Sequence, residues 1–144
     1  DAAGGEYFAT AGEWNDTFTI LDGTGAIVST TEVSDRDIPS DLPRVVDAGS
    51  PLFSPDSVST FRMKGRTYAS FSLRHSGAVA VYDVSDAAAP AFVQAIAVGK
   101  DEQGKADPDG STIRPEGVSA AADGSFLVVA NEAESSASLI LRIE

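Results

Sequence analysis

The apolar residues of this chain occur only in short runs, and no stretch of about 12 or more residues has the spacing of an amphipathic helix. The runs are rich in β-branched and aromatic residues and are bounded by Gly, Pro, Asp, Asn or Ser, a pattern typical of strands joined by turns. The pattern predicts ten strands, at residues 7–11, 17–21, 26–31, 57–63, 67–73, 78–84, 91–98, 117–121, 126–131 and 138–143.

Turn chemistry separates these runs. The segment Asp22-Gly-Thr-Gly25 is predicted to join the second strand to the third, and we interpret it as a turn rather than a protease motif. Lys64-Gly65 is expected to flank the fifth strand. Asp123-Gly124 predicts a hairpin with a type I′ turn, because both central residues of that turn need positive φ.

The strand spacing favours repeated units. Three strands precede residue 50, four lie within about 40 residues of the middle, and three follow, which is close to the 40–45 residues of a propeller blade. We therefore predict an all-β chain of about three β-propeller blades of four antiparallel strands, with blade-like units near residues 6–50, 56–98 and 115–144 and an incomplete ring. A β-sandwich of about ten strands is the alternative.

Composition excludes several classes of function. The 144 residues include no Cys, which removes disulfide scaffolds, zinc ribbons, Fe–S clusters and thiol nucleophiles. A net charge of −12 argues against nucleic acid and anionic membranes as partners. No apolar run approaches the ~18 residues of a membrane span.

Because the chain starts at Asp1 and its one Met is Met63, we expect a processed product, an excised fragment or a partial chain.

Three segments together carry a family resemblance. Residues 65–94 read GRTYASFSLRHSGAVAVYDVSDAAAPAFVQ, residues 114–118 read RPEGV and residues 126–132 read FLVVANE. This order resembles the C-terminal part of the choice-of-anchor I domain family, over roughly residues 6–143. The resemblance implies a secreted or cell-surface β-propeller whose remaining blades come from the same precursor, from another chain or from self-association.

The sequence also departs from the family pattern. The family has Pro-Glu-Gly at the head of the complete blade, where this chain has Pro55-Asp56-Ser57, and the family's acidic position after the second-strand Leu is Arg74 here. These departures weigh against a catalytic role.

Four oxygen-bearing residues are the candidate metal ligands. Glu116 lies at the head of a predicted innermost strand, Asn131 and Glu132 end its neighbour, and Asp56 heads the adjacent blade. Ca²⁺ takes six to eight oxygen ligands of these kinds, so Ca²⁺ is the candidate cofactor. The alternative is that Glu116 and Glu132 are anchors between blades, paired with Arg114 or with backbone N–H groups. The acidic loop 101–111 is a weaker calcium candidate, because it breaks the EF-hand pattern.

Basic residues define a rival hypothesis. A calcium-dependent phosphatase or esterase needs cationic groups for phosphate, and Arg74, Arg114 and the lone His75 are the candidates for ligand binding. No Gly-x-Ser-x-Gly elbow, Ser/His/Asp set or phosphate-binding loop is present. The sequence therefore favours a non-catalytic, extracellular binding or structural module, with extracellular matrix or mineral as candidate partners of its acidic surface.

Overall fold

The protein is described by a computed structural model, which covers residues 5–40, 42, 53–98, 113–133 and 135–140. Within these residues there is no helix, so none could span a membrane, and the prediction of an all-β chain is confirmed. The ten strands are β1 (Tyr7–Gly12), β2 (Thr17–Asp22), β3 (Ile27–Glu32), β4 (Pro55–Met63), β5 (Arg66–Leu73), β6 (Ala78–Asp83), β7 (Ala91–Ala97), β8 (Pro115–Ala120), β9 (Leu127–Asn131) and β10 (Ser136–Ile140).

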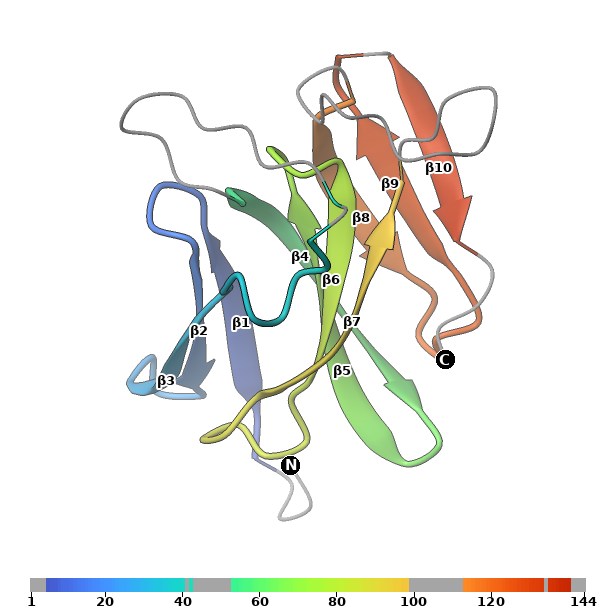
Figure 1. The fold of residues 1–144 in the computed structure, drawn as a ribbon. Helices are drawn as coiled ribbons and strands as arrows, with labels where there is room; N and C mark the ends of the chain where they lie inside the picture. The colour runs from blue at the N-terminus through green and yellow to red at the C-terminus, as the bar shows by residue number, and fades with distance from the viewer. Residues whose placement is uncertain (1–4, 41, 43–52, 99–112, 134, 141–144) are drawn as a thin grey trace.

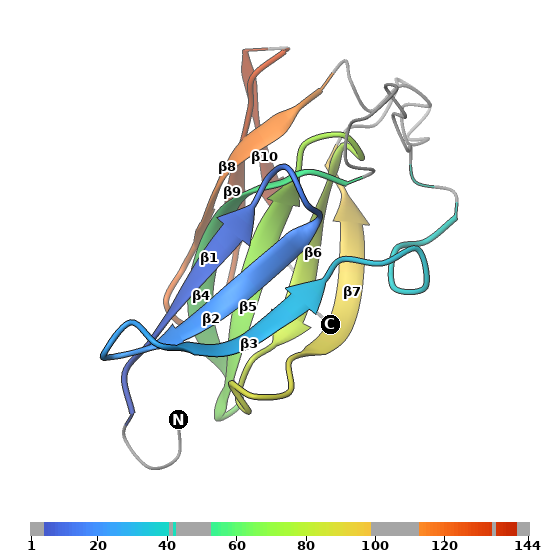
Figure 2. The same ribbon diagram turned by 90° about the vertical axis from the view of Figure 1, so that its left-hand side faces the viewer.

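The strands form three antiparallel sheets in which neighbours along the chain pair with each other. We call β1-β2-β3 the N-terminal sheet, β4-β5-β6-β7 the central sheet and β8-β9-β10 the C-terminal sheet. The central sheet lies between the other two, as Figures 1 and 2 show, and its two faces contribute to two separate apolar cores. Successive side chains of the central strands belong to the two cores in alternation, because side chains of a β-strand point to opposite faces in turn.

Aromatic side chains dominate the core between the N-terminal and central sheets. Phe18 of β2 stacks on Phe71 of β5 with ring centroids 4.4 Å apart, and Tyr82 of β6 lies 4.7 Å from Phe18. All three side chains are almost completely buried. The core between the central and C-terminal sheets holds Phe61 stacked on Tyr68, together with valines of both sheets.

The turns agree only partly with the sequence prediction. The two-residue turn with positive φ at both centres is Lys64-Gly65, where φ is 51° and 78°. The Asp123-Gly124 hairpin forms, but the type I′ prediction is wrong. Gly124 has a φ of 72°, whereas Asp123 is not among the residues with positive φ, and the Gly124 N–H donates to the Ala121 carbonyl. A side chain at Gly124 would also collide with the Phe61 ring.

The first strands of the central and C-terminal sheets begin in the same way. Ser54 and Arg114, each just before a proline, adopt left-handed conformations with φ of 53° and 46°. Their carbonyls accept the N–H groups of Arg74 and Glu132, at 3.1 and 2.9 Å. These two residues directly follow β5 and β9. Arg74 and Glu132 therefore occupy equivalent positions, as do Asp56 and Glu116 after the two prolines.

A second recurring feature links all three sheets. A left-handed residue follows β1, β5 and β9 at the same distance, at Asp16, Gly77 and Ser135, with φ of 51°, 55° and 50°. The carbonyls of Asp16 and Gly77 accept N–H groups of Val33 and Val98, which lie just after the last strand of each sheet. Residues 7–22 consequently align without gaps on residues 68–83.

This alignment makes β1 the equivalent of β5 and β9, the second strands, and not of β4 and β8. β8 runs parallel to β4, because Val118, Ala120 and Ala122 hydrogen-bond successively along it. β1 runs the opposite way, with its end beside the start of β4. The described N-terminal sheet thus has the second, third and fourth strands of the repeat and lacks the first.

Candidate functional site

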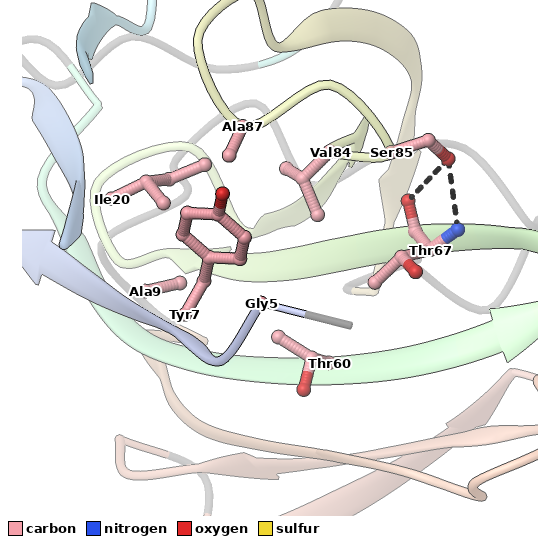
Figure 3. Close-up of a pocket in the computed structure, with 9 residues that line it drawn as sticks. All are labelled: Gly5, Tyr7, Ala9, Ile20, Thr60, Thr67, Val84, Ser85 and Ala87. Atoms are coloured by element: carbon pink, nitrogen blue, oxygen red, sulfur yellow. Dashed lines mark hydrogen bonds between the residues drawn. The ribbon is translucent and has the colours of Figure 1, made fainter. Parts of the chain in front are cut away.

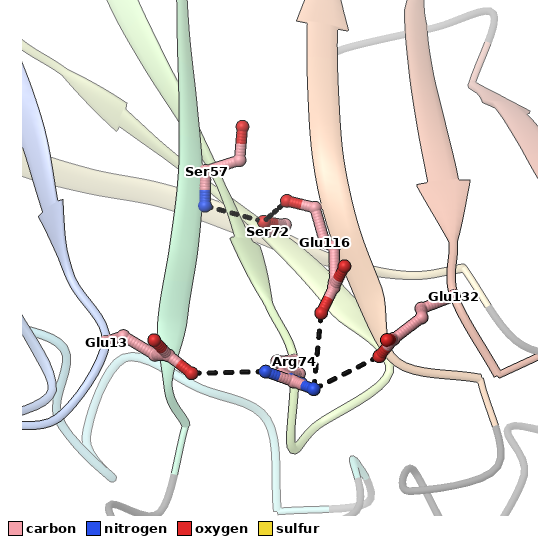
Figure 4. Close-up of polar contacts among 6 residues, drawn as sticks. All are labelled: Glu13, Ser57, Ser72, Arg74, Glu116 and Glu132. Carbon is pink, nitrogen blue, oxygen red and sulfur yellow. Dashed lines mark hydrogen bonds and ion pairs between the residues drawn. The ribbon is translucent and has the colours of Figure 1, made fainter.

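One arginine connects all three sheets at the end where β4 and β8 begin. The Arg74 guanidinium lies 3.1 Å from a carboxylate oxygen of Glu13, 3.2 Å from one of Glu116 and 3.1 Å from one of Glu132 (Figure 4). Glu13 follows β1, Glu116 lies in β8 and Glu132 follows β9. With Asp56, whose charge interacts with these groups, they form what we call the Arg74 cluster.

The repeat explains why these side chains meet. Glu13, Arg74 and Glu132 occupy the same position after the second strand of three consecutive sheets, so the stacking of the sheets aligns them in a row. Their charges alternate along that row, and each neighbouring pair is an ion pair. Because Arg74 is only about one quarter exposed, its ion pairs are screened less than those of a fully solvated arginine.

Negative charge exceeds positive charge within the cluster. Burial, followed by repulsion from Glu13, raises the pKa of Asp56 above its ordinary value, against the attraction of Arg74. Burial, followed by the hydrogen bond and charge of Glu132, raises the pKa of Glu116. One guanidinium thus does not offset four carboxylates, and the folded state favours protonation of Asp56 and Glu116.

Glu116→Gln is therefore expected to leave the chain as stable or slightly more stable at neutral pH. A raised carboxyl pKa gives stability that is fully present below the ordinary value of 4.5 and is lost as pH rises through the folded-state pKa. Glutamine stays neutral, so the variant loses this pH dependence, with a gain below about 1 kcal/mol because the site is part-exposed. Urea unfolding between about pH 4 and pH 7 measures it.

The matched control for this experiment is Glu6→Gln, which changes an exposed carboxylate before β1. At neutral pH this variant should differ in stability from the unmodified chain by less than about 0.5 kcal/mol. A larger loss of stability for Glu116→Gln than for Glu6→Gln at neutral pH contradicts the account of an overloaded cluster.

Serine hydroxyls hold the backbone of Glu116 in place. The Ser72 hydroxyl accepts the N–H of Ser57 at 2.9 Å and donates to the Glu116 carbonyl at 2.8 Å (Figure 4). Farther along, the hydroxyls of Ser57 and Ser59 accept the N–H groups of Val118 and Ala120, at 3.3 and 3.0 Å. Backbone groups on the edge of β8 that does not pair with β9 thus form hydrogen bonds with side chains of the central sheet. These hydrogen bonds fix the register between the two sheets.

The structure brings together four of the seven site residues that the sequence singled out: Asp56, Arg74, Glu116 and Glu132. Asn131 is buried between the central and C-terminal sheets, where its amide donates to Ser136 and Ser138 of β10. Its Oδ1 has no hydrogen-bond partner among the described residues.

The remaining two predicted residues, Arg114 and His75, make backbone hydrogen bonds. Arg114 is exposed and left-handed, and its carbonyl accepts the N–H of Glu132. The His75 N–H donates to the Phe53 carbonyl at 3.2 Å. The carboxylates of Glu116 and Glu132 pair with Arg74, whereas the anchor alternative names Arg114 or backbone N–H groups as their partners.

Two acidic residues of the turn between β1 and β2 are not among the site residues that the sequence predicts. Glu13 completes the row through Arg74, and the Asp16 carboxylate accepts the N–H groups of Phe53 and Ser54, at 2.9 and 2.7 Å. Asp16 thereby links the first hairpin to the start of β4. The gapless alignment of residues 7–22 on 68–83 was the signal that identifies both positions.

Metal binding by the cluster stays a prediction. Within residues 5–40, 42, 53–98, 113–133 and 135–140, no three or more Asp, Glu, His or Cys side chains are grouped to hold a metal ion. The acidic loop 101–111 lies outside the described residues.

A separate pocket of about 190 Å³ lies between β1 and the central sheet (Figure 3). Tyr7 and Ala9 of β1 line one side, and Thr60, Val84 and Ala87 line the other. At its end, the Ser85 hydroxyl accepts the N–H of Thr67 at 2.9 Å.

Comparisons with known proteins give this chain no relative: no family model, no curated protein and no solved structure matches it.

Proposed function

We propose that this chain is a segment of a secreted or cell-surface β-propeller and acts as a non-catalytic binding or structural module. The observation that carries the proposal is the backbone frame that recurs from sheet to sheet. The repeated left-handed residue after β1, β5 and β9, and the parallel course of the first strands β4 and β8, support successive blades around one axis. Further blades complete the ring.

Burial supports blades over a sandwich. A two-sheet sandwich encloses one interior, whereas the central sheet here is covered on both faces by separate apolar cores. Phe71 and Phe61 are each at most 2% exposed, although they belong to different cores.

The Arg74 cluster favours a structural role for these carboxylates. Arg74 is already engaged by Glu13, Glu116 and Glu132, so a phosphate group would have to displace them and would meet their negative charge. No described contact favours the phosphatase or esterase alternative. Extracellular matrix or mineral remains the proposed partner class, attracted through cations to a chain of net charge −12.

Enzyme assays test the proposal directly. We expect p-nitrophenyl phosphate and p-nitrophenyl acetate to be hydrolysed no faster than in buffer, with millimolar Ca²⁺ or with EDTA, because Arg74, the cation beside the clustered carboxylates, is already engaged by Glu13, Glu116 and Glu132. Glu116→Gln is the matched control. Turnover that EDTA removes and that Glu116→Gln abolishes overturns the non-catalytic assignment in favour of metal-assisted hydrolysis.

A further inference from the structure

β1, which is the equivalent of the second strand of the repeat, has one open edge in the N-terminal sheet. β5 pairs with β4 and β6, and β9 pairs with β8 and β10, but β1 pairs only with β2 among the described strands. Because β1 is the equivalent of β5 and β9, the repeat predicts a first strand along its other edge. An unpaired strand edge presents N–H and C=O groups that can pair with an added strand.

The repeat fixes the direction and register of that strand. Pro55 lies opposite Leu73 at the end of β5, and Pro115 lies opposite Asn131 at the end of β9. The equivalent position in β1 is Gly12. A first strand on this edge therefore runs antiparallel to β1, with its proline opposite Gly12, and the N–H groups of Ala9 and Ala11 point toward it.

Among the described strands, β4 lacks a contact with a first strand of the preceding sheet, although β8 has that contact. β8 contacts both β4 and β5, whereas β4 contacts β1, the equivalent of β5, without a first strand at its side (Figures 1 and 2). The N–H groups of Val118 and Ala120 are accepted by serine hydroxyls. Their equivalents, Val58 and Thr60, have no such hydroxyl beside them within the part of the chain that the structure describes.

The pocket beside β1 matches one side chain of the absent strand. Phe61, near the end of β4, stacks on Tyr68 with ring centroids 5.4 Å apart and fills the space between the central and C-terminal sheets. Tyr7 is the equivalent of Tyr68, and it lines the pocket between the N-terminal and central sheets with Thr60 (Figure 3). A phenylalanine at the position of Phe61 would enter this pocket.

We propose that the open edge of β1 is a docking site for one extended peptide strand of the sequence type Pro-x-Ser-Val-Ser-x-Phe. The strand runs antiparallel to β1, its serine hydroxyls accept the N–H groups of Val58 and Thr60, and its phenylalanine occupies the pocket beside Tyr7. The inference rests on the proposed function, since it specifies the strand that completes the N-terminal blade.

Charge determines the residue after the proline. Asp56 and Glu116 follow the prolines of β4 and β8. In a strand docked on β1, the residue after the proline would lie beside Glu13 and Asp56, in a cluster that already has more carboxylates than cations. A peptide with lysine at this position should bind more tightly than one with aspartate. The difference in affinity should shrink as salt screens the charges.

Synthetic peptides based on residues 53–62, FSPDSVSTFR, test the proposal on the ¹⁵N-labelled 144-residue chain. Addition of FSPKSVSTFR should shift and protect the amide signals of β1, Val58 and Thr60 in NMR spectra. N-methylation of the peptide serine that directly follows the valine removes an N–H that faces β1. This change should weaken binding about tenfold or more. N-methylation of the following threonine, whose N–H faces away, should have little effect.

Several other outcomes would contradict the docking site on β1. Amide shifts confined to β3, β7 or β10, equal loss from both N-methyl peptides, or no binding of any peptide would overturn the docking site. Self-association of the chain that the peptide does not reverse would assign the edge to a second copy and would also overturn it. None of these results depends on hydrolase activity, so this failure is distinct from failure of the proposed function.

Discussion

Replacing Phe71 by alanine is expected to lower the free energy of unfolding by about 3–5 kcal/mol. The Phe71 side chain is 0% exposed and contacts both Phe18 and Tyr82, so its removal leaves a cavity between the N-terminal and central sheets. A chain of this size has a total stability of about 5–15 kcal/mol. The variant should therefore unfold at a much lower urea concentration.

Phe126→Ala is the matched control, because Phe126 is 40% exposed in the hairpin before β9. It should cost less than about 1 kcal/mol. Urea unfolding followed by tyrosine and tryptophan fluorescence measures both variants. Equal losses for the two would contradict the burial of Phe71 between stacked sheets.

Replacing Arg74 by glutamine is expected to cost about 1–3 kcal/mol at neutral pH and low salt. The change removes the cation that contacts Glu13, Glu116 and Glu132 and leaves four carboxylates close together. The uncompensated negative charge favours protonation of Asp56 and Glu116, so the loss should shrink as the pH falls toward about 4. Thermal unfolding as a function of pH gives both results.

Arg62→Gln is the control for Arg74→Gln, since Arg62 is an exposed residue near the end of β4. Millimolar Ca²⁺ should raise the melting temperature of Arg74→Gln more than that of the unmodified chain, because the ion can replace the missing charge. A pH-independent loss equal to that of Arg62→Gln would contradict the cluster as a tie between sheets.

Much of the fold could be predicted from the sequence because strands and turns are encoded locally. All ten strands lie within two residues of their predicted starts, since β-branched runs bounded by turn residues specify extended backbone. The Asp123-Gly124 turn type was wrong because the conformation of Asp123 depends on the whole hairpin, including the fit of Gly124 against Phe61. Local sequence does not contain that long-range contact.

The site was harder to predict because its residues are far apart in the chain. Their places at strand ends single out Asp56, Glu116 and Glu132, whereas the sequence offers Arg74 only as a candidate for binding phosphate. Its actual partners depend on how three sheets stack, which no local pattern encodes. Glu13 required the alignment of the first hairpin on the central one, in which only a few residues are identical.

The alternation of Glu13, Arg74 and Glu132 bears on how longer assemblies are ordered. If two copies of the chain were joined end to end, a glutamate would face a glutamate at the junction, whereas a blade with arginine or lysine at this position would be matched to either outer sheet. The row thus discriminates between neighbours by charge, and it disfavours indiscriminate polymerisation through the two outer sheets.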